Sequence, residues 1–388
     1  VGHPWFQRLR DIKQLGLTSF VYPGANHSRF QHCLGALYLM ETALATLKSK
    51  NVEISDMEEE AALVAILLHD IGHGPFSHAL ETSLINGIDH EALSLLLMER
   101  MNETFSGRLD LAIEIFKGTY NRRFLHELIA GQMDMDRLDY LKLDSFFTGV
   151  IEGSVGSDRI IRMLNVVDGR LVIDEKGIYS VEKFLIARRL MYWQVYMHKT
   201  VLSSESLLEN VLARAKELAM KGIDLYATPA LRFFLYNNIG PEELENRGVF
   251  TPGLIAANFT RLDDSDILSS AKYWADHDDP DLADLAGRLI SRNLLAVELQ
   301  NRPFPEDRIE ELREKARVMM KIDQQISRYY IFTDSISNLT YAPDAPEVRI
   351  LLKNGKTAGI REVSDMFDHD LLSEKVTKYF LCYPKELR

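Results

Sequence analysis

The chain has 388 residues, of which 46% are hydrophobic and 26% charged, enough for one large globular domain or two. Its net charge of -12 argues against a broad surface for nucleic acid or for an anionic membrane, because such surfaces are basic. Cys33 and Cys382 are too few for a disulfide framework, and no apolar run approaches the ~18 residues of a membrane span. We therefore expect a cytoplasmic protein.

The first predicted element is a short helix, in which Leu9, Ile12 and Leu15 recur at helical spacing and Gly16 ends the run. Several polar and basic residues fall mainly on its other side, namely Gln7, Arg8, Arg10, Lys13 and Gln14. This pattern favours a solvated helix surface over an anion site.

A capping box, Ser28-x-x-Gln31, predicts a helix that runs to about Lys50. Arg29 and His32 fall in its first turn, where the helix dipole favours anions. Taken alone, His32 is more typical of a hydrogen-bonded polar residue than of a metal ligand.

A second box, Ser55-x-x-Glu58, predicts the helix that delivers His69 and Asp70 to a glycine-flanked turn. Residues 61–68 are wholly apolar, so this helix lies in the core and the pair lies at its edge. An unpaired charge there is costly, and a metal ion removes that cost. Imidazole with carboxylate suits first-row transition metals. The alternative is a hydrogen-bonded His-Asp pair without a metal.

Three further histidines follow within about twenty residues of His69. Pro75 predicts the first turn of a helix that puts His78 and Glu81 one turn apart, after His73 in the glycine turn. His90 opens the next predicted helix.

Residues 126–149 are predicted to form one helix that ends at Gly149. Asp136, Tyr140 and Asp144 share a stripe on it, because they are four residues apart. Acidic stripes are usually solvated, but the apolar neighbours of this one favour a buried ligand carboxylate.

Asp168-Gly169 predicts a small hairpin, and a long helix follows from about Val181. Arg188, Tyr192 and Tyr196 share one line on that helix, close to Lys199. They offer a cation and two hydroxyls to one pocket, with ordinary helix packing as the alternative.

The remainder is predicted to be mostly helical from 205 to about 335, with a solvated charged helix over 306–317. A strand over 348–352, a tight turn at Asn354-Gly355, a helix and a strand follow. We expect a mainly α chain with three parts: a core over 1–205, a helical extension over 206–340 and a small α/β module over 341–388.

The set of His32, His69-Asp70 and Asp136, each on a predicted helix, resembles the HD-domain phosphohydrolase superfamily. Longer blocks are similar to its deoxynucleoside triphosphate triphosphohydrolases, the dGTPase-like branch that includes the sterile-alpha-motif/HD enzyme of vertebrates. The similarity covers roughly residues 4–205, and the blocks that carry it are 7–16, 27–32, 69–78, 134–140 and 196–199.

The resemblance implies an HD-domain helical fold and a role for each matching residue. The implied metal ligands are His32, His69, Asp70 and Asp136. The implied acid-base group is His73, His78, Glu81 and His90. The implied substrate contacts are Arg29, Arg137, Tyr140, Asp144, Arg188, Tyr192 and Tyr196. A possible effector or interface site is Gln7, Arg10, Gln14, His198 and Lys199.

Three of these positions depart from the pattern of the family, as seen in the vertebrate enzyme. Glu81 stands in place of an Asp. Arg137 replaces a Lys that is common there, which keeps the charge but changes its geometry. Tyr192 stands where that enzyme has His, which leaves this contact in doubt.

The resemblance implies hydrolysis of a dNTP to deoxynucleoside and tripolyphosphate by metal-activated water that attacks the alpha phosphorus. The arginines would offset the substrate charge, and His78 or His90, oriented by Glu81, would protonate the leaving oxygen. The expected cofactor is a divalent ion, Fe, Mn, Mg, Ni or Zn. Expected partners are an activator nucleotide and further copies of the chain in a homotetramer.

Two other functions stay open at this point. Another HD reaction, 5'-nucleotidase or phosphodiesterase, would share the metal but not the triphosphate contacts. A nucleotide-sensing protein with a vestigial site is the alternative from a different class.

Overall fold

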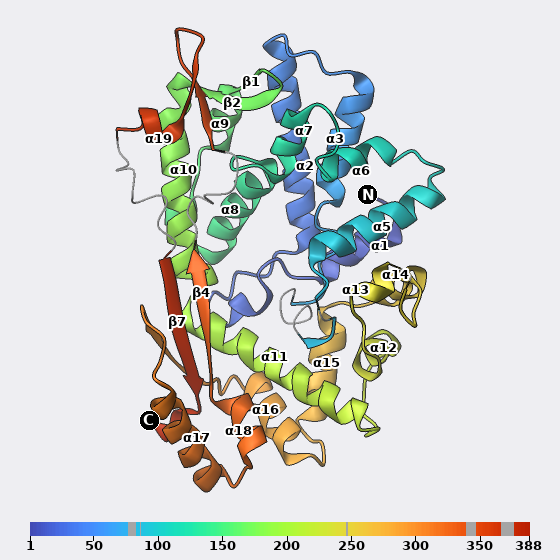
Figure 1. Cartoon of the computed structure of the whole chain (residues 1–388), viewed down its shortest axis with the longest axis vertical. Coiled ribbons are helices and arrows are strands. Elements are labelled where there is room, and N and C mark those ends of the chain that lie inside the picture. Colours follow the sequence, from blue (N-terminus) through green and yellow to red (C-terminus); the bar gives the residue numbers. More distant parts are fainter. Residues whose placement is uncertain (77–82, 86, 246, 339–346, 366–375) are drawn as a thin grey trace.

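The computed structural model describes residues 1–76, 83–85, 87–245, 247–338, 347–365 and 376–388 (Figure 1). Helices make up most of it, and two small sheets complete it, which confirms the predicted mainly α class. None of the described helices is long and apolar enough to cross a lipid bilayer.

The helices that carry the predicted site lie together in the upper half of Figure 1. Helix α2 packs against α3 and α8, and α8 also contacts α7 and α10. The bounds are α2 Arg29–Ser49, α3 Asp56–Leu68, α5 His90–Thr104, α6 Asp110–Phe116, α7 Arg123–Ala130, α8 Met135–Thr148, α9 Ser157–Met163 and α10 Ile178–Met191.

Both predicted capping boxes are confirmed. The backbone N–H of Ser28 donates to Gln31 Oε1 at 2.9 Å, and that of Ser55 donates to Glu58 Oε2 at 2.9 Å. These contacts satisfy N–H groups that a helix start leaves without partners. They fix where α2 and α3 begin, and therefore where His32 and His69 lie.

The prediction of one helix over 126–149 is wrong, because residues 131–134 separate α7 from α8. Gly131 is extended, and a Cβ there would lie 2.3 Å from the Glu127 carbonyl oxygen. Asp134 then caps α8 by accepting from the backbone N–H of Arg137 at 2.7 Å. Helix α10 is likewise followed by a π-helical turn, Tyr192–Tyr196.

The N-terminal segment also differs from its prediction. It forms α1 (Pro4–Gln7) and the 3-10 helices η1 (Arg8–Asp11) and η2 (Gly16–Phe20), so Gly16 begins an element where we expected it to end one. Arg8 is buried rather than solvated. It donates to the carbonyl oxygens of Ile71 and His73 at 2.9 Å each and to that of Leu262 at 3.1 Å.

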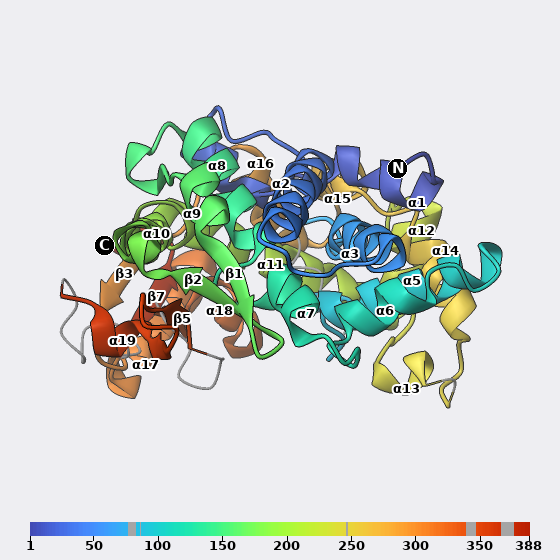
Figure 2. The ribbon, with the colours of Figure 1, turned by 90° about the horizontal axis from the view of Figure 1, so that it is seen from above.

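In Figure 1, α16, α17 and α18 lie below α11, α12 and α14 lie to the right, and α19 lies near the top. Seen from above in Figure 2, α9 and α10 lie toward one end of the molecule and α5, α6 and α14 toward the other. The bounds are α11 Lys199–Met220, α12 Pro229–Tyr236, α13 Pro241–Leu244, α14 Pro252–Phe259, α15 Asp264–Trp274, α16 Pro280–Ile290, α17 Glu306–Met320, α18 Gln324–Tyr330 and α19 Ile360–Val363.

The predicted hairpin is confirmed as β1 (Leu164–Val167) and β2 (Arg170–Asp174). The tail strand β5 (Arg349–Leu351) pairs in parallel with β2 and antiparallel with β6 (Thr357–Gly359). The second sheet has the order β3 (Ala296–Gln300), β7 (Val376–Tyr383), β4 (Phe332–Asn338), all antiparallel. The strands of the tail therefore pair with strands from earlier parts of the chain.

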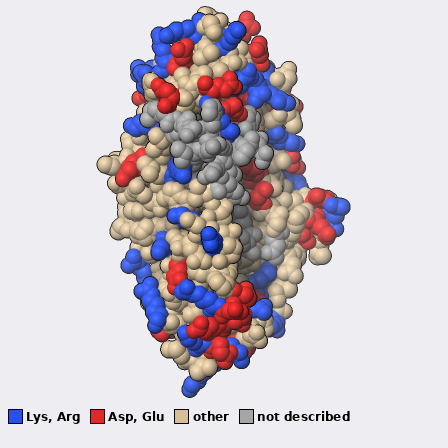
Figure 3. Space-filling view, turned by 60° about the vertical axis from the view of Figure 1, so that its left-hand side comes forward, with Lys and Arg blue, Asp and Glu red and all other residues tan. Residues whose placement is uncertain are grey.

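The charged helix α17 is solvated, as predicted. Arg313, Lys315 and Arg317 pair with glutamates one turn away on the same helix. In the view of Figure 3, Lys and Arg side chains lie beside Asp and Glu side chains toward the lower end of the molecule.

Candidate metal centre

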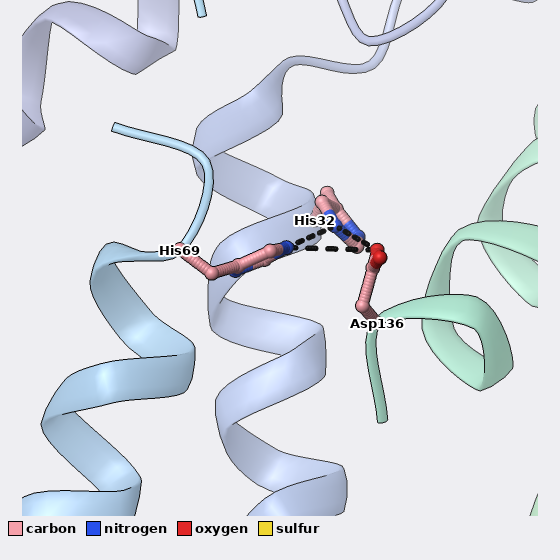
Figure 4. A group of neighbouring side chains, drawn as sticks. All are labelled: His32, His69 and Asp136. Carbon is pink, nitrogen blue, oxygen red and sulfur yellow. Dashed lines mark hydrogen bonds and ion pairs between the residues drawn. The ribbon is translucent and has the colours of Figure 1, made fainter. Parts of the chain in front are cut away.

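Three side chains from three helices meet at one point (Figure 4). His32 is in the first turn of α2, His69 follows the last turn of α3, and Asp136 is in the first turn of α8. His32 Nε2 lies 3.3 Å from His69 Nε2 and 3.1 Å from Asp136 Oδ1, and His69 Nε2 lies 3.5 Å from that same oxygen.

These separations fit a shared ion. Two ligand atoms about 2.1 Å from an ion, at tetrahedral or octahedral angles, lie about 3.0–3.4 Å apart. Two imidazoles and one carboxylate form a mixed nitrogen and oxygen donor set, which divalent first-row metals accept. The three atoms therefore constitute a candidate metal site.

Asp70, the fourth predicted ligand, borders this group. Its Oδ1 lies 3.4 Å from His69 Nε2, and its Oδ2 lies 3.8 Å from His32 Nε2. Oδ2 also accepts from Arg29 at 2.6 Å, and Oδ1 lies 3.2 Å from His73 Nε2. Within the described residues, Asp70 thus joins the three ligand atoms to Arg29 and His73.

The rear nitrogens of both imidazoles are held by the protein. His32 Nδ1 donates to Asp139 Oδ2 at 2.8 Å, and His69 Nδ1 donates to the Ile66 carbonyl oxygen at 2.6 Å. These bonds leave each Nε2 as the atom that faces the site, which is the usual arrangement behind a metal-bound histidine.

Asp139 was not predicted, although the sequence contains a signal for it. Asp139 lies one turn after Asp136, and Gly35 lies one turn after His32. A Cβ at Gly35 would lie only 2.0 Å from Asp139 Oδ1. The missing side chain at Gly35 therefore leaves room for the carboxylate that orients His32.

The electrostatics of the group favour charged carboxylate. Burial raises the pKa of Asp136, but hydrogen bonds from His32 and His69 outweigh burial and hold that pKa well below its usual range. Burial lowers the pKa of His73 to about 3, and the positive charge of Arg29 adds to this effect. His73 is therefore neutral near pH 7.

The predicted acid-base residues are described only in part. His73 and His90 stack with ring centroids 4.0 Å apart at 15°. Ser94 holds the intervening backbone, because its Oγ accepts from the Gly72 N–H at 2.9 Å and donates to the His69 carbonyl oxygen at 2.8 Å. His78 and Glu81 lie outside the described residues.

Tyrosines extend from the ligand group toward α10. The ring centroid of Tyr140 lies 6.5 Å from that of His32 and 6.3 Å from that of Tyr196, which in turn lies 5.2 Å from that of Tyr192. The guanidinium carbon of Arg188 lies 6.0 Å from the Tyr192 ring centroid. One guanidinium group and three tyrosine rings thus lie beside the candidate ligands.

Like Arg29, the predicted substrate residues Arg137, Asp144 and Tyr196 have partners within the chain. Arg137 donates to the Gly131 carbonyl oxygen at 2.7 Å and forms an ion pair with Asp134. Asp144 accepts from the Tyr196 hydroxyl at 2.6 Å and from His27 Nε2 at 2.8 Å. His27, which was not predicted as a site residue, stacks on the ring of Phe147.

The predicted effector residues lie on two segments. Arg10 Nε donates to Gln7 Oε1 at 2.8 Å, and the Gln14 N–H donates to the His27 carbonyl oxygen at 2.9 Å. His198 caps α11, where its Nδ1 accepts from the Thr200 N–H at 3.2 Å, and Lys199 is the first residue of that helix.

Comparison with known proteins matches this geometry to a family. The HD domain family matches residues 29–142, which hold all four predicted ligands, and the HD associated region matches residues 155–227. The uncharacterized protein YwfO of Bacillus subtilis is 32% identical over this whole chain and 88% of its own. A phosphohydrolase of Bacteroides thetaiotaomicron has a solved structure with a TM-score of 0.94 and 53% identity, over 98% of this chain and 94% of that one.

Named relatives match over a shorter length. The deoxynucleoside triphosphate triphosphohydrolase SAMHD1 homolog of Dictyostelium discoideum is 31% identical over 55% of this chain and 45% of its own. HD domains depend on metal, and the candidate ligands lie within the matched residues, so a divalent ion is the cofactor of this site. The chain belongs to the HD-domain phosphohydrolase superfamily.

Proposed function

We propose that this hydrolase cleaves deoxynucleoside triphosphates to deoxynucleoside and tripolyphosphate. The observation that carries the proposal is that Arg29 donates to Asp70 beside the candidate ligands, while Arg188 lies against Tyr192 at the end of the row of tyrosines that reaches His32. Cations for a triphosphate and rings for a nucleoside are thus close to the candidate ligands. Similarity to SAMHD1-type triphosphohydrolases supports the same substrate.

The metal and the arginines would have separate tasks. When bound, a divalent ion supplies an activated water and polarises a phosphoryl oxygen. Arg29, Arg137 and Arg188 offset the charge of the triphosphate, about four negative units near neutral pH. Arg29 and Arg137 are paired with Asp70 and Asp134 in this structure, so phosphate oxygens would compete with those carboxylates.

The leaving 5'-oxygen needs a proton. His73 is buried and neutral near pH 7, and it stacks on the ring of His90. Histidine is the side chain that most often serves as a general acid in catalysis. We assign the donor to His90 or His78, with Glu81 orienting it. Asp144 and Tyr196 form a bonded pair that would accept the sugar hydroxyl, and Tyr192 would line the same pocket.

The test is a panel of four dNTPs and four NTPs, with and without added effector nucleotides. We expect nucleoside and tripolyphosphate as the products of dNTPs. The Asp136→Asn variant should lose turnover while Arg302→Gln, an exposed charge control, keeps it. Release of orthophosphate or a nucleoside monophosphate would instead indicate 5'-nucleotidase or phosphodiesterase chemistry. No turnover of any nucleotide would favour a nucleotide-sensing role.

We also propose that the chain acts in the cytoplasm as a homotetramer that an activator nucleotide stabilises. Gln7, Arg10, Gln14, His198 and Lys199 are the proposed effector or interface residues. Light scattering with and without each nucleotide tests this point. A mass that stays at one chain throughout would contradict it.

A further inference from the structure

A cavity whose lining includes none of the candidate metal ligands lies between α7 and the paired strands β2 and β5. Its volume is about 290 Å³. Residues of α7, the 131–134 linker, β2 and β5 line it, and those that carry its chemistry are Lys117, Arg123, His126, Gln132, Arg170 and Arg349. The proposed function uses none of them.

The cavity is basic in an otherwise acidic chain. Four Lys or Arg residues line it, against two glutamates. Glu127 is already satisfied, because Oε1 accepts from Arg170 Nε at 2.5 Å and Oε2 accepts from the Leu171 N–H at 2.7 Å. Glu347 accepts from the backbone N–H of Arg361 at 3.3 Å. Both glutamates of the lining therefore already accept hydrogen bonds from the protein.

Arg170 is paired with Glu127, but the structure shows no such pair for the other three cations among the described residues. Among the residues that the structure describes, no carboxylate pairs with Lys117, Arg123 or Arg349. Within the described part of the chain, Arg349 donates to the neutral hydroxyl of Thr357, at 2.9 Å. Four positive charges thus line the cavity against two negative ones, and the structure shows no ion pair for three of the four among the described residues, which favours an anionic ligand.

Gln132 indicates that the ligand also carries a hydrogen-bond donor. Its side chain is buried, with 8% of its surface exposed, and its Oε1 has no hydrogen-bond partner within the described residues. Buried polar atoms are nearly always paired, so this acceptor calls for a donor from a ligand. His126 also lines the cavity, and because its Nδ1 donates to the Ile115 carbonyl oxygen at 3.0 Å, Nε2 is the ring nitrogen left for a ligand.

We propose that this cavity binds a small phosphorylated molecule that also carries hydroxyl or amide donors. The phosphate would lie among Lys117, Arg123 and Arg349, and a donor would reach Gln132. The volume lies at the lower end of the range for small-molecule pockets, about 300–1,000 Å³, which suits a sugar phosphate better than a nucleoside triphosphate. This site is independent of the proposed dNTP reaction.

The cavity is linked to the candidate metal centre by a short stretch of chain. Gln132 lies in the linker whose Gly131 carbonyl oxygen accepts from Arg137 and whose Asp134 caps α8. Asp136 follows in the first turn of α8. A ligand that holds Gln132 would therefore stiffen the segment that positions Asp136 and Arg137.

The test is calorimetric titration of the full, metal-loaded chain with ribose 5-phosphate, inorganic phosphate and ribose. We expect ribose 5-phosphate to bind more tightly than phosphate and ribose not to bind. Arg123→Gln should weaken both phosphates about tenfold, the loss of one charge-assisted contact. Gln132→Leu should weaken ribose 5-phosphate about tenfold and leave phosphate unchanged.

Two controls separate this site from the candidate metal centre. Arg302→Gln makes the same charge change on the surface and should bind as the unmodified chain does, and Arg188→Gln alters only the wall of the metal centre. Absence of phosphate binding to the unmodified chain would overturn the proposal. So would affinity that falls in Arg188→Gln but not in Arg123→Gln. Because Arg123 is exposed, its replacement leaves folding intact, which the melting temperature checks.

Discussion

Asp139 holds the ring nitrogen of His32 that faces away from the other two candidate ligands. Asp139 accepts from His32 Nδ1, and burial raises the pKa of Asp139 although this hydrogen bond opposes the rise. A carboxylate in this position sets the ring orientation and increases the basicity of the opposite nitrogen. Asp139 is therefore a positioning residue for the metal ligand His32.

We predict that Asp139→Asn lowers metal affinity about 10- to 100-fold, the usual effect of removing such a partner. Competition with a fluorescent chelator measures the dissociation constant. Asp276→Asn, an exposed carboxylate on the surface, is the matched control and should bind metal as before. Equal affinity in the two variants would contradict the positioning role.

A second prediction concerns the glycine opposite Asp139. In Gly35→Ala the new methyl group would lie 2.0 Å from Asp139 Oδ1, so the carboxylate or α2 must shift. We expect a loss of about 1–3 kcal/mol in the free energy of unfolding, typical of overpacking. Urea denaturation measures it, with Gly253→Ala, where a Cβ meets nothing within 4 Å, as the control.

At the scale of elements, the sequence predicted where helices begin better than where they break. Both capping boxes could be predicted because each of their hydrogen bonds joins residues only three positions apart in the sequence. The break at Gly131 and the buried position of Arg8 were not. Arg8 looked like part of a solvated face because its acceptors, Ile71 and Leu262, lie 63 and 254 residues away in the chain. Local periodicity carries no information about such partners.

Arg8 attaches the N-terminal segment to the turn that follows His69 and Asp70. We predict that Arg8→Met lowers the free energy of unfolding by about 3 kcal/mol or more, because it leaves buried carbonyl oxygens without donors. Arg302→Met is the control, since Arg302 is exposed, and it should cost about 0.5 kcal/mol or less. Chemical denaturation of both variants decides the point, and an equal small loss in the two would refute the role of Arg8.

At the scale of the molecule, the two helices that carry His32 and deliver His69 were predictable, and so was the convergence of His32, His69 and Asp136. The sheets were predictable only in part. The strand at 349–351 follows from its apolar sequence, but its parallel pairing with β2 joins segments more than 170 residues apart. The same holds for β7, whose neighbours β3 and β4 precede it by 38 residues or more. Strand partners over such separations leave no local pattern.

Overall stability should depend on pH through Asp264, which joins α15 to the N-terminal segment. Burial raises its pKa to about 6, against hydrogen bonds that include the Lys13 N–H at 3.0 Å. Between pH 4 and pH 6 the folded chain therefore binds more protons here than the unfolded chain, so this group makes stability fall as pH rises. Asp264→Asn should gain about 2–3 kcal/mol relative to the unmodified chain between pH 4 and pH 7. Urea denaturation at both pH values measures that difference, and no change in it would contradict the assignment.

The metal content of the purified full chain tests the central claim most directly. Plasma mass spectrometry of the unmodified chain, Asp136→Asn and the control Asp276→Asn should find about one divalent ion per chain in the first and third. It should find little or none in the second, which should keep its helical circular dichroism. Equal metal content in Asp136→Asn and the unmodified chain would contradict the assignment of His32, His69 and Asp136 as the site that holds the ion.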